Sequence, residues 1–263
     1  MPAYFEPLGD DRYRPTALAS GAWNPGEIHF SPLGGLIVHV IDRHRARTAR
    51  AGQPHTKQLG RISFDILGFL AADECTITVQ TIRPGRTIEL VEATVVIGDR
   101  PAVLARAWFV GGSDTAGVAG GQPDPLPGPD TVSPQSLSHT WSGGFVASLD
   151  VRPVSPVLPG RASVWLRSDV ELVEGEEVGP GASFIALVDT ANGIAVREPI
   201  TQWMFPNLDL TVHLFRQPQG SWVGLDTSVA FGAAGLGLTS SVLHDAAGPV
   251  GRAEQLLTVR PAP

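Results

Sequence analysis

Asp209 and His213 are the two residues whose types and spacing most directly suggest chemistry. They lie four positions apart in the run LDLTVHLFR, which alternates apolar and polar residues as a strand does. Because alternate side chains of a strand point to the same face, the carboxyl group and the imidazole could act there as an acid and a base. A polar contact across to the neighbouring strand is the simpler explanation of the same spacing, and we favour it.

The other reactive residue types form no recognisable catalytic motif. Cys75 is the only cysteine, and its place at the end of an alternating run is typical of a packed thiol. The seven histidines are His29, His39, His44, His55, His139, His213 and His244. They show no H-E-x-x-H spacing, and the sequence contains no G-x-S-x-G nucleophile motif. We therefore expect no metal, no cofactor and no serine nucleophile.

Three further polar residues stand in apolar or strand-like surroundings. Asp189 comes late in the apolar run SFIALVDTANG, Gln255 lies in an alternating run, and Asn207 follows a proline. By themselves, these positions are typical of a residue at a helix end, a solvent-facing strand residue and a turn residue. Local sequence alone does not make them catalytic.

Two stretches of the chain, 61–109 and 207–255, share one layout at a constant offset of 146 positions. The identical pairs are Phe69 and Phe215, Thr81 and Thr227, Leu90 and Leu236, Val96 and Val242, Asp99 and Asp245, Arg106 and Arg252, and Ala107 and Ala253. The alignment needs no gap, and apolar residues fall at the same positions in both stretches. We infer that one unit is duplicated, and we expect the function where the two similar halves meet.

The elements expected to position these residues fall on either side of a Gly/Pro-rich linker at 111–136. We expect a first unit at 1–110 and a second unit at 137–263, which carries the candidate residues. In the first unit the spacing predicts a helix at 32–50 and strands at 61–69, 75–83, 87–98 and 102–110. In the second unit it predicts strands at 143–154 and 162–172, a helix at 179–194, and strands at 208–216, 221–231, 237–245 and 251–260. The predicted fold class is α+β: two tandem hotdog units, each a central helix wrapped by an antiparallel sheet, which together form a double hotdog.

Charge and hydropathy exclude several classes of protein. The net charge is −7, and the 19 basic residues are scattered, which argues against a nucleic-acid surface. The N-terminal residues lack the basic flank and apolar run of a signal peptide, and no apolar stretch approaches the ~18 residues of a membrane span. We expect a cytoplasmic protein without a membrane span and without a nucleic-acid partner.

With these elements and residues, the sequence resembles the double-hotdog acyl-CoA thioesterase II (TesB-like) family of the thioesterase-like superfamily. The resemblance is densest in the second half: Asn207-Leu208-Asp209, Trp222, the turn GLGLTSSVLHD and the ending GPVGRAEQLLTVR. It extends to GGLIVHV at 34–40 and to PGRTIELVEA at 84–93. It covers most of the chain outside the linker.

The resemblance implies a site made of Asp189, Asn207 and Gln255. Asp189 matches the family's helix aspartate, which activates a water molecule, and Gln255 matches its strand glutamine. Gln255 and Asn207 would orient that water. Asn207 stands where the family has threonine, and its amide still offers both a donor and an acceptor. The water would attack the thioester directly, without a covalent acyl-enzyme. Backbone N–H groups near Gly34 and Gly35 are expected to bind the substrate oxygen.

The implied function is hydrolysis of an acyl-CoA to free acid and CoA, within fatty acid metabolism. One alternative is an acyl-thioester or lipid-binding module that has lost turnover. Another is a hotdog enoyl-CoA hydratase that uses Asp209 and His213. Coenzyme A and acyl carrier protein both stay open as the carrier, because Arg43, Arg45, Arg47 and Arg50 are more typical of a solvated helix end than of a phosphate pocket. We also expect a homodimer of double-hotdog chains.

Overall fold

The structure is a computed structural model that describes residues 1–48, 56–137 and 140–263. The helices are α1 (Phe30–Thr48), α2 (Gly144–Ala147), α3 (Pro180–Val188) and α4 (Ala191–Ile194). The strands of the first half are β1 (Ala3–Gly9), β2 (Arg12–Pro15), β3 (Lys57–Ile66), β4 (Cys75–Arg83), β5 (Ile88–Ile97) and β6 (Arg100–Gly111). Those of the second half are β7 (Leu149–Pro153), β8 (Arg161–Ser168), β9 (Glu171–Val173), β10 (Trp203–Met204), β11 (Asp209–Leu214), β12 (Val223–Phe231), β13 (Leu236–Asp245), β14 (Gly248–Thr258) and β15 (Arg260–Pro261).

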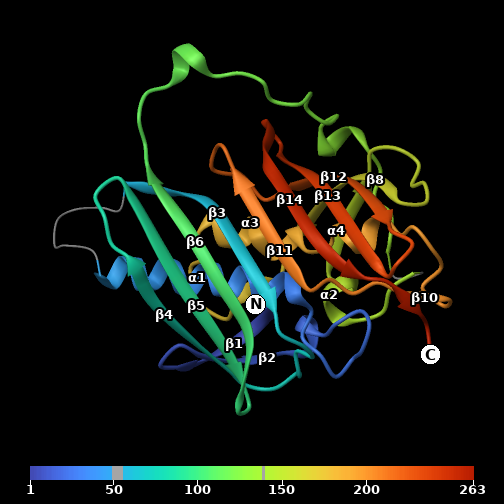
Figure 1. Cartoon of the computed structure of the whole chain (residues 1–263), viewed down its shortest axis with the longest axis horizontal. Coiled ribbons are helices and arrows are strands. Elements are labelled where there is room, and N and C mark those ends of the chain that lie inside the picture. The colour runs from blue at the N-terminus through green and yellow to red at the C-terminus, as the bar shows by residue number, and fades with distance from the viewer. Residues whose placement is uncertain (49–55, 138–139) are drawn as a thin grey trace.

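The main strands form one continuous sheet, and the helices lie on one of its faces (Figure 1). The strand order is β7-β8-β12-β13-β14-β11-β3-β6-β5-β4-β2-β1-β9. Six strands of each half follow the same relative order outward from the centre, where β3 and β11 pair antiparallel, and β9 of the second half adds to the edge formed by β1. One long helix of each half, α1 or α3, packs against the inner face. This is the α+β double-hotdog arrangement that the sequence predicts.

The hairpin registers show that the two halves repeat at an offset of 148 positions. Ile97 pairs with Arg100 at the tip of one hairpin, and Asp245 pairs with Gly248 at the tip of the other. At the centre of the sheet, Ser63 pairs with its own counterpart Thr211, so the halves are related by a pseudo-twofold axis at this pair. The predicted offset of 146 was wrong by two residues. Since side chains alternate with period two along a strand, a shift of two keeps the apolar pattern in phase and conceals the error.

The structure differs from the predicted elements at several places. The predicted helix at 179–194 is divided into α3 and α4. The N-terminal run, with its prolines and charges, was not predicted as strands, but it forms β1 and β2 and buries Tyr4, Phe5 and Tyr13. The predicted strand at 143–154 begins as α2 before it becomes β7. The predicted strand at 162–172 divides into β8 and β9, and β9 pairs with β1 of the first half. These are tertiary pairings, which local periodicity does not contain.

The helices α1 and α3 contact each other across the middle of the molecule. Gly35 of α1 lies so close to α3 that a Cβ atom there would come 2.5 Å from Cβ of Ala186 and 2.9 Å from the carbonyl oxygen of Ala182. Only glycine allows this approach of two helix backbones without displacement. The contact fixes the position of α3 and therefore of the residues at its end.

We predict that Gly35→Ala destabilises the protein by about 1–3 kcal/mol, because the added methyl group overlaps α3. Urea denaturation followed by circular dichroism measures this change. Gly181→Ala is the matched control, since a Cβ there meets nothing within 4 Å. Alanine has the higher helix propensity, so the control should be neutral or stabilising by about 0.5–1 kcal/mol. Equal stability of the two variants would contradict the proposed role of Gly35.

Candidate active site

Asp189 is a buried carboxylate at the C-terminal end of α3. The sequence folds locally this way because α3 opens with a proline at its first position and buries most of its apolar residues. The helix ends at Val188, and Asp189 caps it before the chain enters α4. Its side chain is only 5% exposed. A carboxylate in such a position needs hydrogen-bond donors.

The side chains of Asn207 and Gln255 supply those donors. Asn207 Nδ2 donates to Asp189 Oδ1 at 2.7 Å, and Gln255 Nε2 donates to the same oxygen at 2.8 Å. An isolated bridge between Asn207 and Leu257 places Asn207 beside β14, two residues along from Gln255. The structure therefore brings the three candidate residues together from a helix end, a loop and the last long strand.

This arrangement leaves one carboxylate oxygen free. Both amides donate to Oδ1, and Oδ2 of Asp189 has no hydrogen-bond partner among the described residues. Asp189 and Asn207 line a cavity of about 120 Å³, together with Trp23, His29 and Phe30. The free lone pairs of Oδ2 are thus available to a molecule in this cavity.

Burial raises the pKa of Asp189 to about 7. The hydrogen bonds from Asn207 and Gln255 partly oppose the shift, because they stabilise the charged form, whereas the negative charge of Asp209 adds to it. A general base is most effective when its pKa lies near the working pH. Asp189 is therefore suited to take up a proton at neutral pH.

The two amides hold the carboxylate itself, whereas the sequence led us to expect them to orient a water molecule. Asn207 Nδ2 also donates to the backbone oxygen of Asp209 at 3.0 Å, so both of its hydrogens are engaged. Gln255 Nε2 lies 3.3 Å from the backbone oxygen of Asp189 as well. The amide oxygens remain as acceptors, and that of Gln255 is buried without a partner in the described part of the chain.

The corresponding positions of the first half carry no such groups. At the offset of 148, Leu59 corresponds to Asn207 and Ala107 corresponds to Gln255, and both are buried apolar residues. The chain thus has the candidate set once, in its second half. The cavity is nevertheless shared, because Trp23, His29 and Phe30 belong to the first half.

Gly34 and Gly35 lie in the second turn of α1 and are not among the residues that line this cavity. Gly34 faces Phe30 and Ile185, and Gly35 faces α3. Their position fits helix packing. The helix begins earlier than the sequence suggested, at Phe30, and the first N–H groups of a helix have no intrahelical acceptor. The N–H of Ser31 donates to His29 Nδ1 and Pro32 has no N–H, so the N–H of Phe30 is the backbone donor that remains at this part of the cavity wall.

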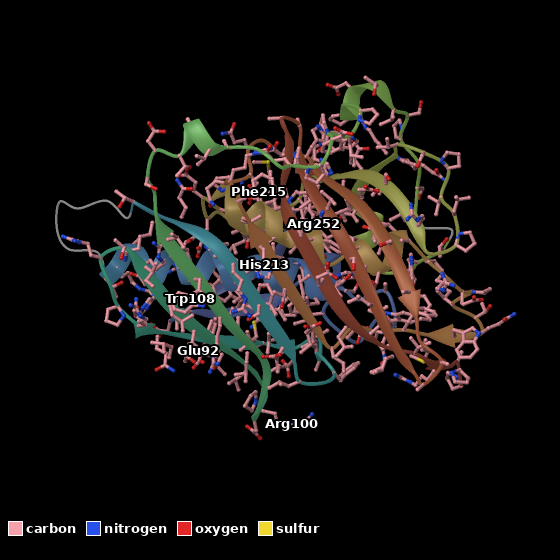
Figure 2. The ribbon with its side chains drawn as sticks, turned by 45° about the horizontal axis from the view of Figure 1, so that its top comes forward. Glu92, Arg100, Trp108, His213, Phe215 and Arg252 are labelled. Carbon is pink, nitrogen blue, oxygen red and sulfur yellow. The ribbon has the colours of Figure 1, made fainter. Side chains whose placement is uncertain are left out.

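Asp209 and His213 lie away from the cavity. Asp209 Oδ1 accepts a hydrogen bond from the backbone N–H of Leu256 at 2.6 Å. His213 is exposed on the outer face of the sheet, near Phe215 and Arg252 (Figure 2). The helices and Asp189 are on the inner side, so this pair offers no acid and base to a substrate in the cavity.

The basic end of α1 is occupied by ion pairs. Arg43 contacts Glu176, Arg45 contacts Glu89 and Arg47 contacts Asp11, all at 2.9 Å. Arg45 is buried and its guanidinium lies 3.6 Å from the ring centre of Phe109. The expectation of a solvated helix end was wrong for Arg45, which is buried beside Glu89, whereas the side chains of Arg43 and Arg47 stay 39% and 50% exposed although each has an acidic partner. Arg50 lies outside the described residues.

The structure gives little support for a metal site or a reactive cysteine. Within the described residues, no three His, Cys, Asp or Glu side chains gather as metal ligands would; His55 and His139 fall outside this part. Burial raises the pKa of the Cys75 thiol to about 12, which keeps it protonated. None of the helices in the described ranges has the length and apolar character needed to cross a membrane.

Comparison with known proteins gives a consistent result. Residues 19–110 match the acyl-CoA thioesterase N-terminal domain, and residues 122–259 match the acyl-CoA thioesterase C-terminal domain. No curated protein matches the chain.

Several solved structures share the fold over nearly the whole length. Acyl-CoA thioesterase II TesB2 from Mycobacterium marinum has 17% identity and a TM-score of 0.66, over 98% of this chain and 95% of that one. A tesB protein from Mycobacterium avium subs paratuberculosis has 18% identity and a TM-score of 0.66, over 98% and 96%. A hot dog fold protein from Alicyclobacillus acidocaldarius has 13% identity and a TM-score of 0.72, over 98% and 96%.

Fold and domain matches together define the class as thioester hydrolases with a double-hotdog fold. The chain belongs to the acyl-CoA thioesterase family, and the family resemblance drawn from the sequence is confirmed.

We predict that Asp189→Asn stabilises the fold increasingly as pH rises. The folded pKa of about 7 lies above the ordinary aspartate pKa of 3.8, so the folded protein keeps a proton that the unfolded chain has lost. Stability of the parent protein therefore falls between about pH 4 and pH 7. Asparagine has no such penalty, and its advantage should grow by about 2–3 kcal/mol between pH 5 and pH 8.

Urea denaturation at pH 5, 6, 7 and 8 measures this difference. Asp99→Asn, in the exposed turn between β5 and β6, is the control, and its curve should follow that of the parent protein. A pH-independent effect of Asp189→Asn would show that the carboxyl group does not titrate near neutral pH.

Proposed function

We propose that the protein hydrolyses an acyl-CoA to a free carboxylic acid and CoA, with Asp189 as the general base. The observation that supports this most strongly is the buried carboxyl group held by two amides through one oxygen, with its other oxygen open to the cavity and its pKa near 7. A thioester carbonyl is electrophilic enough to react with a positioned water, so one base and a fixed geometry are sufficient.

In this mechanism, water donates hydrogen bonds to Asp189 Oδ2 and to the amide oxygen of Asn207. The water oxygen attacks the thioester carbonyl carbon while Asp189 takes up a proton. The backbone N–H of Phe30, at the start of α1, stabilises the oxyanion. The intermediate then expels the CoA thiolate, which receives the proton from Asp189, and the acid leaves. No bond between enzyme and acyl group forms.

The walls around the cavity favour a short acyl group. A recess of about 30 Å³ adjoins the cavity and is lined by apolar side chains that include Leu137, Trp141 and Val146. Trp141 lines the recess and is fixed by a hydrogen bond from its Nε1 to the Gly193 carbonyl at 2.8 Å.

Thiol release from acetyl-, butyryl-, octanoyl- and palmitoyl-CoA tests the proposal. The parent protein should turn over the short substrates, and kcat should rise with pH through a pKa near 7 as Asp189 ionises. Asp189→Asn should lower kcat about 10²–10⁴-fold and leave acyl-CoA binding largely intact. Absence of turnover on every substrate, with binding retained, would favour the non-catalytic acyl-binding module.

The variant Asn207→Thr tests the effect of having asparagine where the family has threonine. Threonine offers one hydroxyl in place of an amide that donates to Asp189 and to the Asp209 backbone. If the asparagine is what suppresses turnover in a binding module, this variant should raise kcat. In the active enzyme that we propose, it should lower kcat.

We further predict that Trp141→Ala shifts the preferred acyl chain to a greater length. Removal of the indole opens the recess beyond Val146, so kcat/KM for octanoyl-CoA should rise relative to butyryl-CoA by about tenfold, the effect of one or two extra buried methylenes. Trp222→Ala is the control, because that indole contacts Arg152 and Arg167 instead. An unchanged chain-length ratio in Trp141→Ala would place the acyl group elsewhere.

We also propose that residues 1–110 and 137–263 are the two units and 111–136 the linker between them. In support, the chain between β6 and α2 contains two short 3-10 turns and, in its described part, no strand. A homodimer of these chains in the cytoplasm is likewise a proposal, which light scattering and cell fractionation would test. The hydratase alternative receives no support, since Asp209 and His213 lie outside the cavity.

A further inference from the structure

His29 is a cavity residue that the mechanism above does not use. It precedes α1 in the first half of the chain and lines both the cavity beside Asp189 and the adjoining apolar recess. Its ring centre lies 4.4 Å from that of Phe145, which fixes the imidazole plane. It therefore faces the catalytic set of the second half from the opposite unit.

The hydrogen bonds of His29 define its protonation. The backbone N–H of Ser31 donates to Nδ1 at 3.1 Å, so Nδ1 is an acceptor and the ring proton sits on Nε2. Burial lowers the pKa of His29 to about 3, which keeps the ring neutral. Nε2 makes no hydrogen bond to the described residues and is not enclosed by them. The imidazole consequently presents one free donor and no free acceptor.

This protonation state excludes His29 as a general base and suits it as a hydrogen-bond donor. A neutral imidazole with Nδ1 engaged and Nε2 protonated cannot accept a proton from water, so His29 is no second general base. The cavity does need donors, because Asn207 and Gln255 spend their N–H groups on Asp189 and on nearby backbone oxygens. The second unit offers acceptors to the reacting water but few donors to a carbonyl oxygen.

We propose that His29 Nε2–H binds the thioester carbonyl oxygen and stabilises the negative charge that develops there when water adds. The inference rests on the proposed hydrolase function and adds a catalytic residue to it. The first unit then supplies the electrophilic side of the site and the second unit supplies the base. A neutral donor is well suited to this position, because it does not transfer its proton and so holds the oxygen through both addition and collapse.

The first test compares His29→Ala with the parent protein. Loss of one oxyanion donor lowers kcat by about 10²–10³-fold in related chemistry. We expect a loss of that order in kcat/KM, with part of it in KM, because the bound substrate also makes the carbonyl contact. His29→Gln should recover part of the rate, because its amide nitrogen reaches the position of Nε2. His29→Asn, whose amide reaches only the position of Nδ1, should not. This pair keeps the test valid if the alanine variant fails to fold.

The second test uses binding without turnover. S-butyl-CoA has no carbonyl group, whereas S-(2-oxobutyl)-CoA carries a ketone one methylene away from the sulfur. Calorimetry should show that His29→Ala weakens binding of the ketone at least tenfold and leaves binding of the thioether unchanged. His44→Ala, a histidine of α1 that contacts Thr81, is the control and should alter neither.

The outcomes separate the two proposals. If the parent protein neither hydrolyses acyl-CoA nor binds these analogues, the proposed function itself fails. If it hydrolyses acyl-CoA but His29→Ala retains the full kcat, or loses both analogues equally, the carbonyl contact is overturned and His29 is a packing residue. A selective loss of the ketone together with rescue by glutamine supports the inference.

Discussion

The hydrogen bonds from two amides to one oxygen of a buried carboxylate are the constraint on which this site depends. Removal of Asp189 from water costs free energy, and donors on Oδ1 recover only part of it. The same asymmetry leaves Oδ2 reactive. The fold must therefore hold a helix end, a loop and a strand in fixed positions around one side chain. The close contact of α1 with α3 and the register of β11 with β14 provide this rigidity.

The two halves of the chain repeat the same strand arrangement but do not carry equivalent residues at the site. The pseudo-twofold relation of the strands is close, yet only one half has a carboxylate held by two amides at its helix end. In the first half, Leu59 and Ala107 occupy the positions of the two amides. That half contributes the opposite wall of the same cavity instead. A site shared in this way needs both units, although the carboxylate and its two amides all come from one.

Much of the fold could be predicted from the sequence, because long alternating runs and an apolar helix are local signals. The three candidate residues could not be derived from local patterns, which indicated a helix end, a turn and a strand surface. Only the family resemblance connected them, and the structure shows that they meet. Sequence could not reveal that both amides donate to one oxygen, because that depends on side-chain orientation across three elements.

Other features lay beyond the sequence for similar physical reasons. His29 carries no motif, and its importance comes from a hydrogen bond with Ser31 and from its place in the cavity wall. The repeat offset was missed by two residues, since a strand pattern of period two is unchanged by that shift. The strands β1 and β2 were missed because their partners are distant in sequence and their own composition is rich in proline and charge.

The pairing of β9 with β1 has a consequence for synthesis of the chain on the ribosome. Residues 1–110 can form their hairpins as soon as they emerge, but the outer edge of β1 stays open until Glu171–Val173 have been made. An open edge is a template for pairing with another chain. The nascent first half must therefore remain unassociated while the linker, β7 and β8 are translated, and β9 then closes this edge of the sheet.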